Sequence, residues 1–219
     1  MKNLSRLLIA ILLFSVTAVF TSCLDDSNDD SIPEETYKSY LSSMAGNYSG
    51  KATFYVPSAS STTSAMVAYD SIQSISWRMR TDSTILVPSF PINKLDSAIN
   101  ITSSTPEKYS LLKDAISEMS STSLTAFYYI PSSSYVSSSQ IQFVVNPYTL
   151  ETTLNYDGAD HKVYFVFYTY TFGGTWTTSR TMGMNMYLTA IYLDGTTSGD
   201  AIPSDYFNPI GIYFEGSGY

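Results

Sequence analysis

Few side chains in this chain of 219 residues are suited to catalysis. His161 is the only imidazole, so a Ser–His–Asp arrangement would have to use it, and no motif marks any serine as the nucleophile. A carboxylate pair, the machinery of glycoside hydrolases, is available by residue type alone. The candidate acids are Glu118, Glu151, Glu215, Asp157, Asp160, Asp194, Asp200 and Asp205. Most of these aspartates stand beside turn residues, where backbone hydrogen bonding explains them. We therefore expect neither an enzyme nor a cofactor.

Side chains that bind metals are equally sparse. With one Cys and one His, the chain can form neither an internal disulfide nor a zinc site rich in these residues. Asp194, Asp200 and Asp205 share one loop and are weak candidates for calcium, but their spacing fits no standard calcium loop. The alternating methionines from Met182 to Met186 could bind Cu(I), although such residues far more often fill the interior of a sheet. We predict a core role for the methionines and no bound metal.

Aromatic side chains favour binding rather than catalysis. They make up 15% of the chain, with 19 Tyr and 11 Phe. Trp176 follows the glycine pair 173–174 and lies near Tyr168 and Tyr170 in the sequence. An exposed Trp flanked by Tyr is how glycan-binding modules stack on sugar faces, and a half-buried Trp at a sandwich corner is the structural alternative. Trp176, Tyr168 and Tyr170 are therefore the predicted ligand-binding residues.

Charge and composition exclude two classes of protein. The chain has 11 Lys and Arg against 19 Asp and Glu, a net charge of −8, which is the wrong sign for holding nucleic acid. Hydrophobic residues make up 44% and charged residues only 14%, so the bulk of the chain is not intrinsically disordered.

The N-terminal residues predict an export signal. Lys2 and Arg6 precede an apolar stretch that runs from Leu7 to Phe20, the pattern of a secretory signal peptide, with an uncleaved anchor as the alternative. The stretch ends in a run of small residues and a lone Cys23. It resembles the lipobox of bacterial lipoproteins, which implies that residues 1–22 are removed and that Cys23 carries acyl chains such as palmitate.

Residues 23–30 contain four aspartates in the run Asp25 to Asp30, too much charge to pack, and so predict a solvated tether. This acidic tether behind the lipidated Cys resembles the export signal of Bacteroidetes-type surface lipoproteins, among them uncharacterised families. The resemblance implies a lipid-anchored protein of the outer membrane, exposed at the cell surface.

Four Asp-Ser pairs, which end at Ser31, Ser71, Ser83 and Ser97, fit the O-glycosylation pattern of exported proteins in that group. Of these, Ser71, Ser83 and Ser97 are the candidate glycosylation sites. The alternative is ordinary turn chemistry, in which Asp and Ser bond to neighbouring backbone groups.

The period of the hydrophobic pattern divides the rest of the chain into helices and strands. One helix is predicted from Ser31, with a Ser31–Glu34 capping box, up to Gly46, and a second from an N-cap at Thr105 to about Met119. Strand patterns occupy residues 48–56, 65–68, 71–80, 83–87, 124–130, 140–145, 151–156, 161–172, 181–193 and 209–214.

Short turns, such as Asp157-Gly158 and Gly173-Gly174, are typical of antiparallel sheets. The predicted fold class is therefore mainly β: an antiparallel β-sandwich or barrel-like body of about nine or ten strands with two accessory α-helices. We expect residues 31–219 to form a single domain. The run from Val163 to Phe172 is apolar or aromatic on both faces, which favours a central strand covered on both sides, with an exposed tyrosine platform as the alternative.

These observations favour a non-enzymatic binding or adhesion module that takes a glycan or another host ligand. Two alternatives stay open. One is an accessory glycan hydrolase that uses a carboxylate pair, and the other is a structural subunit of a surface assembly. The expected partners are a membrane, through the N-terminal lipid, and a glycan or protein ligand, without nucleic acid.

Overall fold

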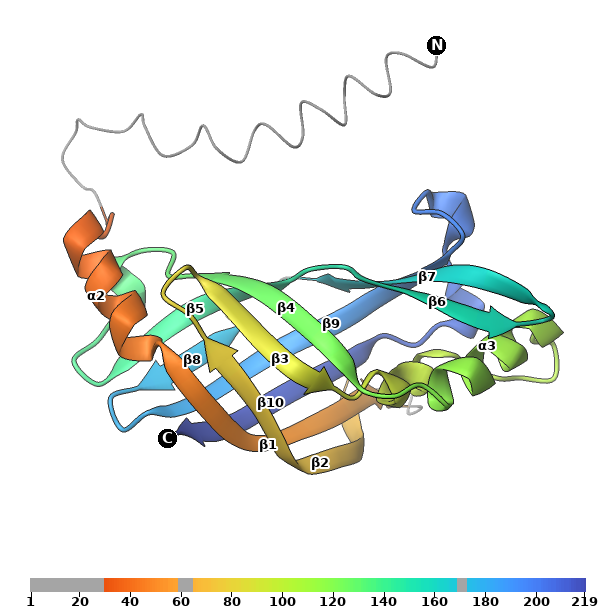
Figure 1. Ribbon diagram of the computed structural model, residues 1–219, viewed down its shortest axis with the longest axis horizontal. Coiled ribbons are helices and arrows are strands. Elements are labelled where there is room, and N and C mark those ends of the chain that lie inside the picture. Colours follow the sequence, from red (N-terminus) through yellow and green to blue (C-terminus); the bar gives the residue numbers. More distant parts are fainter. Residues whose placement is uncertain (1–29, 59–64, 169–172) are drawn as a thin grey trace, which may run out of the picture. The chain divides into compact units, whose positions relative to one another are not determined.

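The computed structural model describes residues 30–58, 65–168 and 173–219. Residues Ile32–Tyr219 form one compact unit. Within the described ranges the chain folds into ten strands and two α-helices (Figure 1). The strands are β1 (Gly46–Pro57), β2 (Met66–Met79), β3 (Thr84–Phe90), β4 (Thr122–Tyr129), β5 (Gln140–Pro147), β6 (Leu150–Tyr156), β7 (Ala159–Tyr168), β8 (Gly174–Thr177), β9 (Thr181–Leu193) and β10 (Ile210–Gly218). The helices are α2 (Glu34–Met44), α3 (Glu107–Ser117) and the short 3₁₀ segments η1 (Ile92–Ala98), η2 (Ser133–Tyr135), η3 (Ser198–Asp200) and η4 (Ser204–Tyr206).

Eight of the strands close into an antiparallel barrel. Their order is β10-β1-β2-β3-β4-β5-β8-β9, and β9 pairs back onto β10 from Leu188 opposite Ile210 to Thr181 opposite Ser217. The remaining hairpin, β6 and β7, extends the sheet beyond the ring, because β7 pairs with the second half of β9. The predicted mainly antiparallel body with two accessory α-helices is confirmed, and of its two forms the barrel is the one observed.

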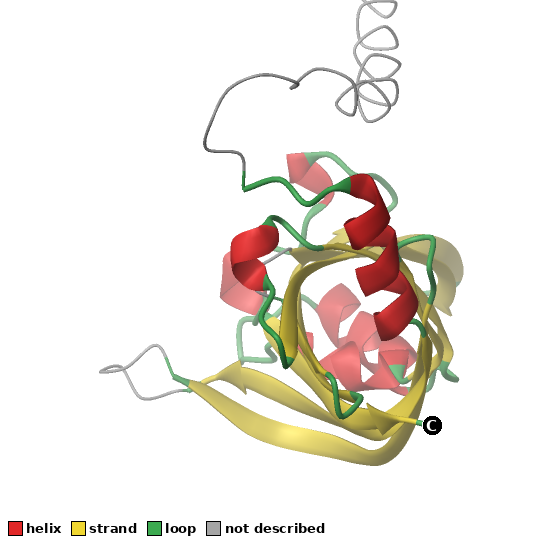
Figure 2. Ribbon diagram, turned by 90° about the vertical axis from the view of Figure 1, so that its left-hand side faces the viewer, coloured by secondary structure: helices red, strands yellow, loops and turns green. Residues whose placement is uncertain are grey.

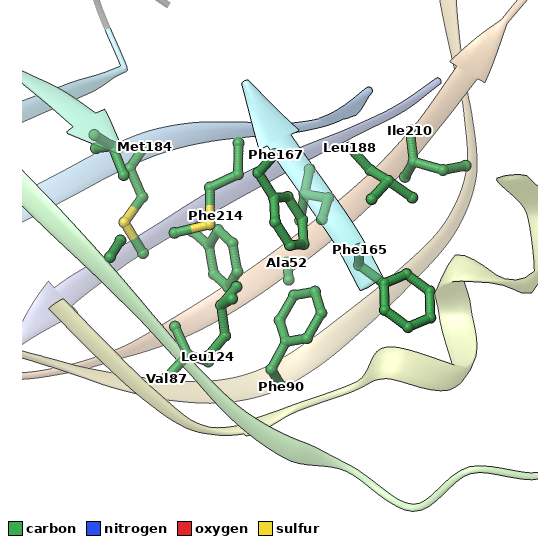
Figure 3. Close-up of a cluster of buried hydrophobic side chains, with 14 of the residues drawn as sticks. Ala52, Val87, Phe90, Leu124, Phe165, Phe167, Met184, Leu188, Ile210 and Phe214 are labelled. Carbon is green, nitrogen blue, oxygen red and sulfur yellow. The ribbon is translucent and has the colours of Figure 1, made fainter. Parts of the chain in front are cut away.

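The barrel interior is a packed core. Strand alternation turns Met182, Met184 and Met186 of β9 inward, where all three are buried, so the predicted core role of the methionines is confirmed. Figure 3 shows side chains from β1, β3, β4, β7, β9 and β10 that meet in this interior, among them Ala52, Val87, Phe90, Leu124, Phe165, Phe167, Met184, Leu188, Ile210 and Phe214. The outward positions of β9 are therefore the ones that face solvent.

The helices lie at the two ends of the barrel (Figures 1 and 2). Leu41 and Met44 bury one face of α2, and α3 packs against η1 and β6. Both α-helices begin directly after a proline and have no side-chain cap, so the predicted capping box and the predicted Thr105 cap are wrong. The Thr105 hydroxyl instead accepts a hydrogen bond from the Thr102 backbone N–H at 2.7 Å. Among the described residues, no helix has the length and apolar character needed to cross a membrane.

Turn chemistry explains one predicted connection and corrects another. Asp157 and Gly158 both adopt positive φ, at 52° and 74°, which is the geometry of the tight turn predicted between β6 and β7. The predicted turn at Gly173-Gly174 is wrong, because Gly174 begins β8. The β8–β9 connection instead runs through residues 178–180, with Arg180 at a φ of 60°. A Cβ at Gly174 would lie 2.2 Å from the Phe143 ring, so glycine is needed there for strand packing.

Candidate functional site

The structure describes two of the three predicted ligand-binding residues, and they differ in burial. Trp176 points into the barrel with 6% of its surface exposed, and its indole N–H donates to the Tyr48 hydroxyl at 3.0 Å. Alternation along β8 sets this direction, so the exposed stacking platform predicted for Trp176 is not formed. Tyr168 ends β7 with 59% of its surface exposed. Tyr170 lies outside the described residues.

The strand that carries Tyr168, β7, agrees with only half of its prediction, because one of its two faces is buried and the other is not. Val163, Phe165 and Phe167 are buried in the core, whereas Tyr164 on the outward face is partly exposed and Tyr168 is exposed. The described part of β7 thus has one covered face and one open face. The expectation of a strand covered on both sides is wrong, and the exposed tyrosine alternative applies to Tyr168.

A surface hollow lies on the outer face of β8, β9 and β10. It has a volume of about 620 Å³, and we call it the outer groove. Its lining residues are Gly173, Gly174, Thr175, Thr177, Thr181, Met182, Gly183, Asn185, Tyr213, Glu215 and Gly216. Most are glycine, threonine or another uncharged residue, and Glu215 is the one charged residue among them.

Glycine at position 183 creates the floor of the outer groove. The strand register places Gly183 opposite Thr175 on β8 and opposite Glu215 on β10. A Cβ at Gly183 would lie 2.6 Å from the Tyr213 hydroxyl oxygen and 3.3 Å from its ring. The Tyr213 ring therefore lies over the glycine backbone. Burial, with the nearby Glu215 carboxylate, raises the pKa of Tyr213, so its hydroxyl stays protonated and can donate or accept a hydrogen bond.

A smaller hollow of about 200 Å³ adjoins the outer groove, and we call it the second hollow. It is lined by Tyr55, Met66, Asn185, Tyr187, Gly211, Ile212 and Tyr213. Asn185 and Tyr213 line both hollows and are direct cross-strand partners. The row that crosses the second hollow contains Tyr187, Gly211 and Tyr55 on three neighbouring strands. Tyr168 extends this row, because it pairs with Tyr187.

The single histidine belongs to a different cavity, of about 380 Å³, beside η3. His161 Nδ1 lies 2.8 Å from Asp194 Oδ2, and the imidazole packs on the Tyr156 ring at a centroid distance of 4.3 Å. This hydrogen bond, with one from the Lys162 backbone N–H, holds the pKa of Asp194 below its usual value. No serine, threonine or cysteine is found among the described residues that line this cavity.

The three aspartates considered for calcium do not come together. Asp194 bonds to His161, whereas Asp200 accepts hydrogen bonds from the backbone N–H and hydroxyl of Thr197 at 2.9 and 2.6 Å. Asp205 lies within the separate 3₁₀ segment η4. In the part of the chain that the structure describes, no three His, Cys, Asp or Glu side chains are grouped to hold a metal.

The candidate glycosylation serines lie in ordinary hydrogen-bonded surroundings. Ser83 has 9% of its surface exposed, so the tight turn would have to open before a glycan could be attached. Ser71 and Ser97 are half-buried. The Asp70 carboxylate accepts from the Ser71 backbone N–H at 2.7 Å, and the Ser97 hydroxyl donates to Asp96 at 3.4 Å. These contacts favour the turn-chemistry interpretation of the Asp-Ser pairs.

Comparison with known proteins identifies the family. A domain of unknown function, DUF4840, matches residues 43–193, more than half of the chain. The chain belongs to the DUF4840 family. The DUF4840 match covers strands β1 to β9 and ends before β10. No curated protein and no solved structure matches the chain. The expectation of an uncharacterised family is confirmed, and the groove residues Gly183 and Asn185 lie inside the DUF4840 segment.

Sequence reasoning missed the outer groove. The pattern that could have revealed it lies on the outward face of β9, where Gly183, Asn185 and Tyr187 alternate with buried residues. A glycine inside a strand often marks a place where a ligand or a neighbouring group approaches the backbone. The second wall, formed by Tyr213 and Glu215, depends on the pairing of β9 with β10, which no local pattern reveals.

Proposed function

We propose that this protein is a non-enzymatic surface lipoprotein that binds a glycan in the outer groove. The observation that carries the proposal is the chemistry of that groove. Hydroxyl and amide groups from Thr175, Thr177 and Asn185 stand beside the Tyr213 ring and the backbone of Gly183. A sugar ring has hydroxyls around its edge and an apolar face, so it matches polar groups placed beside an aromatic ring.

The size and place of the outer groove support the same function. Its volume of about 620 Å³ falls within the range of roughly 300–1,000 Å³ that is typical of small-molecule sites. The barrel interior is filled with buried side chains, so the outer face is the surface that can accept a ligand. Trp176 borders another hollow, of about 480 Å³, but presents only 6% of its surface there.

Binding fits the groove better than hydrolysis. A carboxylate pair needs two acids held about 5–10 Å apart across the ligand. Among the described residues that line the outer groove and the second hollow, Glu215 is the single acid. We therefore keep the glycan hydrolase as an alternative that this site does not favour.

The proposal includes a lipid anchor at Cys23. A Cys23→Ser variant, expressed in a bacterial host fed labelled palmitate, should lose both the label and its fractionation with membranes. Protease added to intact cells should digest the wild-type protein if it faces outward. Equal labelling of Cys23→Ser and wild type would contradict the anchor.

A glycan array tests the binding function. The full chain in detergent should be retained by specific glycans, and a Tyr213→Ala variant should lose at least tenfold in affinity. Tyr148→Ala is the matched control, because Tyr148 is 53% exposed and lines neither hollow. Retention of no glycan would refute the proposal and favour a structural subunit. Equal binding by Tyr213→Ala and wild type would refute the site.

A further inference from the structure

The outer groove and the second hollow adjoin on the outer face of the sheet and share two lining residues. The outer groove covers β8, β9 and β10, and the second hollow continues over β9 and β10 to β1. The shared pair Asn185 and Tyr213 forms the boundary between them. Neighbouring strands are spaced by about 4.8 Å, so the path from β8 to β1 is roughly 14 Å long. This path is longer than a single sugar ring.

We infer that the two hollows are adjoining subsites for an uncharged oligosaccharide of at least two rings, an inference that rests on the proposed glycan-binding function. The outer groove is the polar subsite, with hydroxyl and amide groups from β8 and β9. The second hollow is the stacking subsite. One ring occupies each hollow, and the Tyr213 side chain contacts both.

Aromatic side chains define the second hollow. Tyr55 and Tyr187 stand on either side of Gly211, which is opposite each of them in the sheet. Gly211 itself is buried, and a Cβ there would lie 3.3 Å from the Tyr187 ring and 3.2 Å from the Met66 Cε, so these two side chains cover its backbone. An apolar sugar face can lie against the surface that Tyr187 and Met66 form, with Tyr55 beside it.

The charged side chains around the two hollows favour the binding of an uncharged ligand over an anionic one. Glu215 is the one charged residue among the described residues that line either hollow. Lys51 lies opposite Glu215 on β1 but lines neither hollow. A uronic or sialic acid would place its carboxylate near Glu215 without a cation in the lining to balance it. Like charges brought together in this way discriminate against the anionic ligand.

Calorimetric titration of the full chain with oligosaccharides of one to six rings tests this inference. The probes are neutral linear gluco- and manno-oligosaccharides, the glycan best retained on the array with its fragments, and oligogalacturonates of matched length. Affinity for the neutral ligand should rise at least tenfold between one ring and three, and each oligogalacturonate should bind more weakly than its neutral counterpart.

Two variants assign the subsites. Tyr55→Ala should abolish most of the gain in affinity with length while single-ring binding persists, and Tyr148→Ala should retain the full gain. Glu215→Gln should reduce the preference for neutral over anionic ligands by at least threefold.

The outcomes separate this inference from the function on which it rests. Failure of every glycan on the array to bind would refute the proposed function itself. Binding of a single ring as tightly as six, tighter binding of anionic ligands, or a full length dependence in Tyr55→Ala would overturn the two-subsite inference alone.

Discussion

The closure of the barrel predicts a severe effect of one added methyl group. Gly50 on β1 pairs with Gly216 on β10. A Cβ at Gly50 would lie 2.0 Å from the Glu215 carbonyl oxygen and 2.5 Å from the Gly216 Cα. Both are backbone atoms that cannot rotate away, and ordinary contacts of a Cβ begin at 3.4 Å. Gly50→Ala must therefore push β1 and β10 apart by more than an ångström.

The size of this effect follows from the hydrogen bonds between the strands. A backbone bond of about 2.9 Å that lengthens by an ångström no longer meets the criteria for a hydrogen bond. We expect about two bonds near Gly50 to break, at about 0.5–1.5 kcal/mol each, with overpacking strain of about 1–3 kcal/mol in addition. The total is about 2–6 kcal/mol. For a domain of this size, each kcal/mol shifts the melting temperature by roughly 2–4 °C.

Thermal unfolding followed by circular dichroism measures this loss. Gly183→Ala is the matched control, because its Cβ meets the hydroxyl end of the Tyr213 side chain, which can swing away. The control should change the free energy of unfolding by less than about 1 kcal/mol, since alanine is itself slightly favoured over glycine in a strand. Equal melting temperatures for Gly50→Ala and Gly183→Ala would refute the close approach of β1 and β10.

Two further predictions concern Trp176 and Asp194. Trp176→Phe should lower the free energy of unfolding by about 1–2 kcal/mol, because it deletes the buried indole donor to Tyr48, and should leave glycan affinity unchanged; thermal unfolding and titration measure the two effects. Asp194→Asn should destabilise the protein at neutral pH and progressively less in acid. His161 lowers the pKa of Asp194 in the folded state from its ordinary 3.8, so the stability is present above that value and is lost as the pH falls through the lowered pKa. A wild-type-to-variant difference in melting temperature that stays constant from neutral pH into acid would contradict this coupling.

Local patterns were sufficient to predict most elements. Alternation and turn residues located β5, β6 and the Asp157-Gly158 hairpin, because each signal lies within a few neighbouring residues. The helices were placed to within a few residues, although prolines 33 and 106 rather than polar caps precede them. These are features that local backbone preferences decide.

Features set by distant pairing were missed. The four-residue strand β8 contains a glycine and gains its pairing only from β5 and β9. That pairing decides that Trp176 points inward, so its sequence neighbours could not reveal its burial. The outer groove likewise needs Tyr213 beside Gly183, which are 30 positions apart in the chain and meet only because β9 and β10 close the barrel.

The most direct test of the glycan site is an NMR titration of the full chain labelled with ¹⁵N only at its 11 glycines. Five of them line the two hollows: Gly173, Gly174, Gly183, Gly211 and Gly216. Three others lie in or next to the His161 cavity: Gly158, Gly195 and Gly199. Addition of a glycan retained on the array should shift the amide signals of the first group and leave the second unchanged. Shifts confined to the second group would place the ligand at the His161 cavity and contradict the site proposed here.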